Sequence, residues 1–376
     1  MNNKNKIIEC SKCVLDTTVV DIEFDTNGVC NYCHAYDKII KTIPIGNNAK
    51  IVLENIVSTI KNNGKNKEYD CLIGLSGGVD STYLAHMVVE LGLRPLVVHI
   101  DTGWNSEIAV QNIENVVNKL NLDLFTYVID WEEMKDLQLS FFKASVPDCD
   151  IPQDHVFPAL LYKIAKQHNI KDIISGHNLV TEFISPKGWV YDSNDLQHIF
   201  DIQNQFGTKK LKKYPTFSLF DRTIYYRYIH PIKSHRLLYY IDYNKEKIKE
   251  FITKELDWKD YGGKHFESKF TKFFQAYYLP TKFGFDKRKA HLSNLILSNQ
   301  ITKEEALFEL NKIIYERQQL VEDIDYIVKK LGITRDKWNE IMNLPLKKHT
   351  DYDTDYDVLW YKLYKKFTLF VKNYNK

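Results

Sequence analysis

Two short segments of this chain combine residue types that do chemistry in proteins. The first is SGGVDS at residues 76–81, which follows a short apolar run and precedes a stretch with helical spacing. Its two glycines let the backbone turn sharply beside an anion, and a helix N-terminus offers unpaired N–H groups and a positive dipole end. Ser76 and Ser81 can add hydroxyl donors, while Asp80 suits a Mg²⁺ ion beside a phosphate. The segment therefore predicts a phosphate-binding loop.

The second segment holds two Cys-x-x-Cys motifs, Cys10 with Cys13 and Cys30 with Cys33, separated by 16 residues. Two such motifs can bring four thiolates around one ion, and a shell of four thiolates leaves no position for water. We therefore expect a structural Zn²⁺. Its binding free energy, on the order of 10 kcal/mol, would replace the core that a short segment cannot build. A redox dithiol or an iron–sulfur site is the alternative.

Alternating strand and helix patterns surround the predicted phosphate loop. Short apolar runs predict strands at 70–75, 95–100, 124–129 and 172–175, and the first two are expected to be buried in a parallel sheet. Helical spacing lies between and around them, at 51–60, 79–91, 106–120, 131–143 and 156–168. This alternation indicates βαβ units and a doubly wound parallel sheet, hence an α/β fold.

The strand pattern fades beyond about residue 245. A capping box at Thr302 and Glu305 starts one helix, and helical patterns follow at 321–331 and 358–371. We therefore expect a zinc-binding module over 1–45, an α/β domain over 46–245 and a helical C-terminal domain over 246–376.

Composition narrows the functional classes. The chain has 51 Lys and Arg against 49 Asp and Glu, a balance that argues against a dedicated nucleic-acid binder. No apolar stretch is long enough to span a membrane, and the first residues have no signal-peptide core. We therefore expect a cytoplasmic protein with no nucleic-acid partner and no membrane insertion. In that compartment the six cysteines would be ligands or core residues rather than disulfides.

The SGGVDS loop, with a second strand ending in His99 and Asp101, resembles the PP-loop ATP pyrophosphatase superfamily, which has a HUP-like sheet. The chain has neither a Walker A motif nor a G-x-G-x-x-G motif, which argues against a Walker NTPase or an NAD-binding Rossmann enzyme. The resemblance implies that ATP is split between its α and β phosphates and that AMP is attached to a carbonyl oxygen of the substrate.

Longer segments resemble one family of that superfamily, the N-acetyl sugar amidotransferases. They are CSKCVLDTT from Cys10, IEFDTNGVCNYC from Ile22, SGGVDSTYLAH, VHIDTGWNSEIAVQNI from Val98, IPQDH, GHNLVTE from Gly176 and the block that begins GGKHFESKF at Gly262. The resemblance implies conversion of an acetamido group to an acetamidino group on a bacterial surface sugar, in lipopolysaccharide O-antigen or nonulosonic acid pathways. It implies ATP and Mg²⁺, and ammonia from a separate glutaminase.

Ligands of open α/β sheets bind at the carboxyl ends of the strands, where many polar residues of this chain are expected. For ATP we expect Ser76, Gly77, Gly78, Asp80, Ser81, His99, Asp101, Gly176 and Glu182. For the sugar we expect Trp104, Asn105, Asp150, Gln153, His177 and Arg288. The catalytic candidates are Asp80, Asp154 and Lys264. The resemblance implies that Glu182 shares Mg²⁺ with Asp80, and it alone supports Lys264 and Arg288.

Structural roles are open for three of these residues. Trp104 could pack beneath its loop instead of stacking on a ligand, and His177 could be a hydrogen-bonded core histidine. Asp154 could cap the helix expected from residue 156 instead of acting in a loop at the edge of the site.

Two other functions compete with the sugar amidotransferase. A tRNA-thiolating PP-loop enzyme would need a basic surface and a reactive cysteine, and Cys149, flanked by two aspartates, is a poor candidate. A non-enzymatic zinc-ribbon adaptor would not need the intact SGGVDS loop. Residue 2 is Asn, not a glutaminase nucleophile, and the three expected domains leave no room for a glutaminase domain. Ammonia should therefore come from solution or from a partner.

Overall fold

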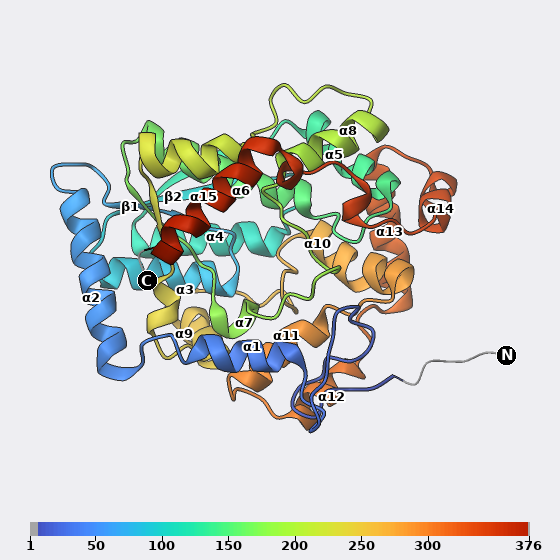
Figure 1. Ribbon diagram of the computed structural model, residues 1–376, viewed down its shortest axis with the longest axis horizontal. Coiled ribbons are helices and arrows are strands. Elements are labelled where there is room, and N and C mark those ends of the chain that lie inside the picture. Colours follow the sequence, from blue (N-terminus) through green and yellow to red (C-terminus); the bar gives the residue numbers. More distant parts are fainter. Residues whose placement is uncertain (1–6, 375–376) are drawn as a thin grey trace.

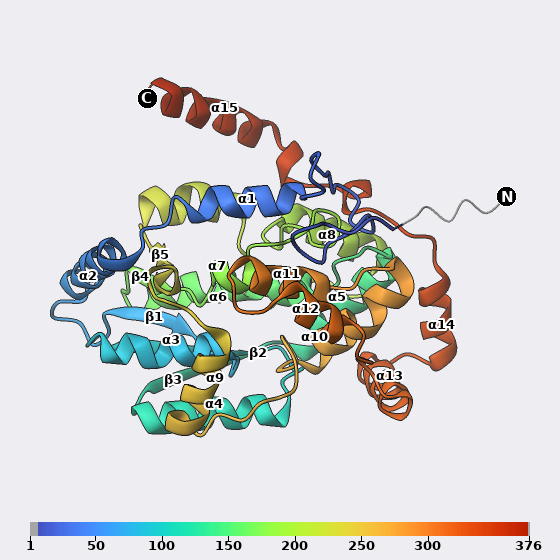
Figure 2. The same cartoon turned by 90° about the horizontal axis from the view of Figure 1, so that it is seen from below.

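The computed structural model describes residues 7–374 (Figures 1 and 2). One five-stranded sheet has the order β3-β2-β1-β4-β5, and all its neighbouring strands are parallel. The strands are β1 (Cys71–Gly74), β2 (Pro95–Asp101), β3 (Asp123–Val128), β4 (Asp172–Ile174) and β5 (Lys233–His235). The predicted doubly wound α/β fold is confirmed. The strand order changes direction on either side of β1, the topology that places ligands at the carboxyl ends of the central strands.

Helices cover both faces of the sheet because its strand residues alternate between the two sides. Leu72, Leu96, Val98 and Ile173 pack in one core with α5 (Trp131–Ala144) and α6 (Ile151–Gln167). Their neighbours Cys71, Ile73, Val97 and Ile174 pack in a second core. That core contains α2 (Gly46–Asn63), α3 (Val79–Glu90), α4 (Glu107–Leu120) and α9 (Lys245–Leu256). The sheet is therefore apolar on both faces, as parallel sheets usually are.

The segment between β4 and α9 contains short elements that the sequence did not predict. It includes α7 (Leu179–Glu182), α8 (Leu196–Phe206), the π-helical η1 (Asp221–Ile229) and the 3₁₀ turn η2 (Leu237–Tyr240). The strand β5 was also missed, because Lys-Ser-His has no apolar alternation to reveal it.

The last third of the chain is helical, as expected. It comprises α10 (Lys269–Phe273), the π-helical η3 (Phe274–Phe283), α11 (Arg288–Leu297), α12 (Lys303–Leu310), α13 (Arg317–Leu331), α14 (Arg335–Asn343), the 3₁₀ turns η4 (His349–Asp351) and η5 (Asp355–Asp357), and α15 (Leu359–Tyr374). The capping box is confirmed, since Glu305 N–H donates to Thr302 Oγ1 at 3.1 Å and Thr302 N–H donates to Glu305 Oε2 at 2.7 Å. Phe270, Phe273 and Tyr278 share the core of α5 and α6, so this region packs directly onto the sheet layer.

Candidate active site

The phosphate loop connects the end of β1 to the start of α3 and is held in one shape by close packing. Gly77 has a φ of +78°, and a Cβ on it would lie 2.5 Å from the carbonyl oxygen of Ala109. Trp258 Nε1 donates to the Gly77 carbonyl at 2.9 Å. Only glycine fits at this position, for reasons of both backbone conformation and space.

The serines of the loop bond to one another across its opening. Their hydroxyl oxygens, Ser76 Oγ and Ser81 Oγ, lie 3.1 Å apart, and Gly78 N–H donates to Ser76 Oγ at 3.2 Å. The same hydroxyls and N–H groups are the donors that a phosphate would accept from at this helix N-terminus. The loop is therefore already ordered. Its hydroxyl and N–H donors, which now bond within the loop, could bond to an anion instead.

A cavity of about 1400 Å³ adjoins this loop. Its walls come from the start of α3, the segment after β4, the start of α9, residues 258–267, α11 and α12. The expected site residues on its wall are Ser76, Gly78, Asp80, Ser81, Asp154, Gly176, His177, Glu182, Lys264 and Arg288. Residues far apart in sequence thus meet at one edge of the sheet, as the topology predicts.

Asp80 and Glu182 face each other through Asn178. Asn178 Nδ2 donates to Asp80 Oδ1 at 3.4 Å, and its backbone N–H donates to Glu182 Oε2 at 3.3 Å. Tyr243 Oη also donates to Asp80 Oδ1. Burial, and then the charge of Glu182, raise the pKa of Asp80. A divalent cation would stabilise both carboxylates in their charged form, so this pair fits Mg²⁺ beside a triphosphate.

Lys264 and His177 complete the charge pattern around Glu182. Lys264 Nζ lies 3.4 Å from Glu182 Oε1 and donates to the Thr181 carbonyl at 2.9 Å. Burial alone would raise the pKa of Glu182, but Lys264 and nearby histidines hold it below its usual value. His177 lines the cavity and pairs through Nδ1 with Tyr239 Oη at 2.9 Å, so it is not a core histidine.

Asp154 lies on the cavity wall with its side chain open to solvent, near the buried carboxyl groups of Asp148 and Asp150. The helix α6 begins at Ile151, earlier than the sequence indicated, so Asp154 is in its first turn and is neither an N-cap nor part of a loop. Burial, and then the charges of Asp150 and Asp148, raise the pKa of Asp154 well above its usual value. A carboxylate with a raised pKa is a stronger base than an ordinary aspartate, which suits it to accept a proton.

His99, Asp101 and Asn105 lie outside the cavity wall and hold the segment that follows β2. His99 Nδ1 pairs with the Leu75 carbonyl at 3.0 Å and its Nε2 with Asn105 Nδ2 at 3.1 Å. Asn105 Nδ2 also donates to Asp101 Oδ1 at 3.1 Å. His99 thus links the segment after β2 to Leu75, the residue that precedes the phosphate loop.

Three expected sugar-binding residues are turned toward protein. Trp104 is fully buried against Trp131 and its Nε1 donates to Gln138 Oε1 at 2.8 Å, so the packing role left open is the one observed. Gln153 Nε2 donates to Asp150 Oδ1 at 2.6 Å, and both residues are buried. Their hydrogen-bonding groups are used inside the protein and are not available to a sugar.

Arg288 lies on the cavity wall, but its guanidinium is occupied by other parts of the protein. It pairs with Asp286 at 2.8 Å and donates to the carbonyls of Glu309 and Leu310 at 3.2 and 3.0 Å. These are the last carbonyls of α12, which a cationic side chain stabilises. Arg288 therefore joins α11 to α12 and shapes the wall.

Several wall residues were not among the expected ones, although Glu267 lies within the block that begins at Gly262. Lys245 is at the first position of α9, where a positive charge opposes the helix dipole, and burial lowers its pKa. Tyr261 Oη and Glu267 Oε1 lie so close to Gly78 that a Cβ on that glycine would be 3.4 and 3.3 Å from them. The position of Lys245 at the start of a helix, where a positive charge is unfavourable, was a sign in the sequence that this residue has another role.

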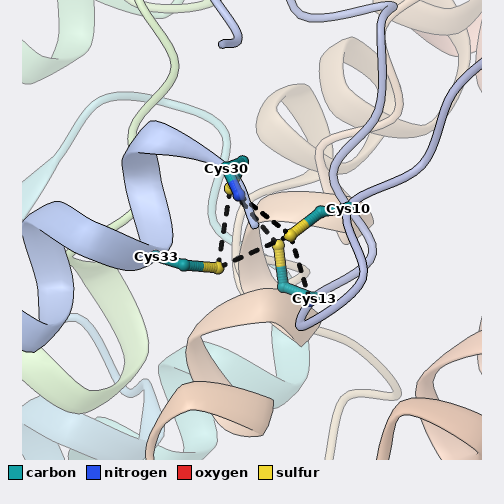
Figure 3. A group of neighbouring side chains, drawn as sticks. All are labelled: Cys10, Cys13, Cys30 and Cys33. Atoms are coloured by element: carbon teal, nitrogen blue, oxygen red, sulfur yellow. Dashed lines mark hydrogen bonds between the residues drawn. The ribbon is translucent and has the colours of Figure 1, made fainter. Parts of the chain in front are cut away.

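The four cysteine side chains of the N-terminal segment point toward one another (Figure 3). All four are buried, and their sulfur atoms lie within 4.8 Å of one another. The Sγ–Sγ distance is 3.8 Å for Cys10–Cys33 and for Cys13–Cys30, and 3.5 Å for Cys30–Cys33. A tetrahedral zinc shell with Zn–S bonds of about 2.3 Å has edges of about 3.8 Å. The cluster therefore fits structural zinc.

The cysteine segment and α1 (Asn31–Ile40) lie beside α11 and α12 in both views (Figures 1 and 2). Val14 N–H donates to Ser293 Oγ at 3.3 Å, and Lys289 Nζ pairs with Asp16 at 2.5 Å. Lys303 Nζ donates to the Cys10 carbonyl at 2.6 Å. The cysteine segment is thus anchored to the helices that form one wall of the cavity.

The parallel sheet carries SGGVDS at the carboxyl end of its central strand, which is the placement expected of a phosphate-binding loop. Residues 267–368 match the family model described as the C-terminal domain of WbpG-like LPS biosynthesis proteins. This match covers about a quarter of the chain and makes its C-terminal region similar to that domain.

Among solved structures, the chain is similar to the NMN synthetase from Francisella tularensis, with 16% identity, a TM-score of 0.35, and coverage of 80% of this chain and 98% of that one. It is also similar to an NH₃-dependent NAD synthetase from Campylobacter jejuni, with 15% identity, a TM-score of 0.32, and coverage of 76% and 97%. No curated protein matches the chain.

Proposed function

We propose that this protein is an ATP-dependent amidotransferase that converts an acetamido group of a bacterial surface sugar to an acetamidino group. The observation that carries the proposal is the placement of the SGGVDS loop, the Asp80–Glu182 pair and Asp154 on one cavity. The match of residues 267–368 to a lipopolysaccharide-biosynthesis domain supports a sugar of the cell surface as substrate.

The first step activates the carbonyl carbon of the acetamido group, which is a poor electrophile. The acetamido oxygen attacks the α-phosphorus of ATP, the bond to the β-phosphate breaks, and pyrophosphate leaves. Ser76, Ser81 and the N–H groups at the start of α3 bind the phosphates, and Asp80 with Glu182 would hold Mg²⁺, which neutralises the charge that develops on the leaving group. Lys264 lies next to Glu182 and can contact the same phosphates.

The second step introduces nitrogen. Ammonia attacks the carbon of the adenylated amide, and the collapse of that adduct expels AMP together with the former amide oxygen. The attacking nitrogen must lose a proton, and Asp154, on the cavity wall with a raised pKa, is the group we assign to accept it. Of the residues predicted for the sugar, Trp104, Asp150 and Gln153 are buried, Asn105 lies outside the cavity wall and Arg288 is bonded to α12. His177 is therefore the residue among them that we assign to contact the sugar.

Ammonia is proposed to come from a separate glutaminase. The two cysteines outside the zinc cluster, Cys71 and Cys149, are buried, and burial raises the pKa of both thiols. Neither can act as a glutaminase nucleophile, which needs an accessible thiolate. The same observation disfavours the tRNA-thiolating alternative, which also needs a reactive cysteine.

The test is mass spectrometry of candidate acetamido sugars incubated with the protein, ATP, Mg²⁺ and ammonium. We expect a product about one mass unit lighter, because an imino nitrogen replaces the carbonyl oxygen, together with AMP and pyrophosphate. Glutamine alone should give no product until a glutaminase is added. ADP and phosphate as products, or thiolated tRNA, would contradict the proposal.

Asp80→Ala should abolish turnover, by about a thousandfold or more, because it removes a metal ligand at the point where charge develops. The protein should remain folded, since Asp80 contributes charge and not core packing. The matched control is Asp242→Ala, which removes an exposed carboxylate next to Tyr243 and should leave the rate unchanged.

A further inference from the structure

The C-terminal helix α15 lies on the outside of the molecule and stands clear of the other elements in Figure 2. The side of α15 that faces the protein is formed by tyrosines. Tyr361 is buried, and Tyr364 Oη donates to the Thr223 carbonyl of η1 at 3.4 Å. Aromatic contacts of Tyr361 with Tyr356 and Tyr364 complete this inner side.

The outward side of α15 is apolar. Leu359, Trp360 and Leu363 are exposed by 72%, 41% and 58%. Positions 359, 360 and 363 lie on one face of a helix. In the sequence, Phe367, Phe370 and Tyr374 continue the same spacing. Among the described side chains of α15, Leu359, Trp360 and Leu363 stay exposed, while the tyrosines make the contacts with the protein.

A second exposed apolar group lies next to α15. Phe220, Tyr228 and Ile229, in and beside η1, are exposed by 49%, 58% and 60%. Tyr364 of α15 donates to the Thr223 carbonyl of η1, so the two groups adjoin each other. We call this surface, formed by residues 220–229 and α15, the C-terminal patch.

The charge of the C-terminal patch is strongly one-sided. Residues 358–376 contain five lysines and no Asp or Glu, although the whole chain is nearly balanced at 51 basic and 49 acidic residues. Lys362 and Lys366 are exposed, and Arg227 of η1 adds a further positive charge. A docking partner with an apolar and an anionic component would complement both features.

We propose that the C-terminal patch binds the surface of an anionic lipid bilayer. The helix α15 has Trp and Leu on one side, lysines beside them, and tyrosines that attach it to the protein on a third side. Such a helix is suited to lie in the plane of the lipid headgroups. Lysines next to such a helix are attracted by the negative charge of anionic lipids. No described helix is long and apolar enough to span a membrane, so the association is with the surface. The proposal does not depend on the enzymatic reaction.

The test is co-sedimentation of the full chain with vesicles of phosphatidylcholine alone and of phosphatidylcholine mixed with phosphatidylglycerol. We expect binding to the mixed vesicles, weakened by salt, and little binding to the neutral ones. Lys362→Glu with Lys366→Glu should weaken binding at least tenfold, because each lysine near an anionic surface contributes about fivefold. The control is Lys50→Glu with Lys254→Glu, the same charge change at exposed positions outside the patch, which should bind as the parent does.

A second variant separates the apolar contribution. Leu359→Asp with Leu363→Asp should also lose vesicle binding while keeping the circular dichroism spectrum and the unfolding temperature of the parent. Equal binding to neutral and anionic vesicles, or no binding to either, would overturn the proposal. So would a dimer in solution that these two substitutions dissociate, because the patch would then be an interface between two copies of the chain.

Discussion

The phosphate loop and the cysteine cluster are both tight turns that present groups to a ligand, but they keep their shape by different means. The loop is shaped by the protein itself: Gly77 leaves no room for a side chain, and Trp258 holds its carbonyl. The cluster brings four buried sulfur atoms together, and thiolates held this close repel one another without a cation. The first site should therefore keep its fold without its ligand, whereas the second should depend on its ion.

The two sites are connected through α11. The cysteine segment bonds to Ser293 and Lys289 of this helix, and the same helix contributes Arg288 and His291 to the cavity wall. Damage to the cluster should therefore reach the cavity, while damage to the loop should not reach the cluster. Two measurements test this comparison, and a third tests a buried carboxyl group next to the cavity.

The largest effect is expected from loss of the metal. Cys30→Ser should reduce bound zinc, measured by elemental analysis, from about one ion per chain and lower the free energy of unfolding by at least about 5 kcal/mol, because metal binding and folding are coupled. Cys149→Ala, which changes a buried cysteine outside the cluster, is the control and should retain the zinc. Full retention of zinc and of stability after all four cluster cysteines are changed to Ser would refute the site.

A smaller effect is expected at Gly77. Gly77→Ala should lower the free energy of unfolding by about 2–3 kcal/mol and weaken ATP binding, since the new Cβ meets Ala109 and the positive φ is strained. Zinc content should not change. Gly188→Ala is the control, because its φ of +86° is similar but a Cβ there meets nothing within 4 Å. Equal destabilisation by the two variants would mean that the close contact with Ala109 contributes nothing.

The smallest effect depends on pH. Burial, and then the charge of Asp148, raise the pKa of Asp150 to about 6. The folded state therefore holds this proton more tightly than the unfolded state, so wild-type stability falls as the pH rises from about 4 to about 6. Asp150→Asn removes this cost and should gain on the order of 3 kcal/mol at about pH 7.5, and much less at about pH 4, in urea unfolding. Asp242→Asn, at an exposed carboxylate, should show no such difference between the two pH values.

The sequence was most informative where local physics decides the structure. Apolar runs predicted β1 to β4 within one or two residues, and the Gly-Gly turn and the cysteine spacing marked both ligand sites. It failed where tertiary contacts decide. Pro152 and its acidic neighbours read as a loop, yet they begin α6, because proline is tolerated in the first turn of a helix. Trp104 carries no local sign that Trp131 would cover it, and Lys245 reaches the cavity only through the packing of α9 against α3.

The anchoring of the cysteine segment to α11 also has a consequence for the order of events during protein synthesis. Val14 and its partner Ser293 are 279 residues apart in the chain. At roughly 5–20 residues per second, the N-terminal segment waits roughly 15–55 s on the ribosome before its packing surface has been made. The four cysteines are complete once Cys33 has emerged. If the ion binds at that stage, the N-terminal segment of the nascent chain folds long before α11, the helix it packs against, has been synthesised.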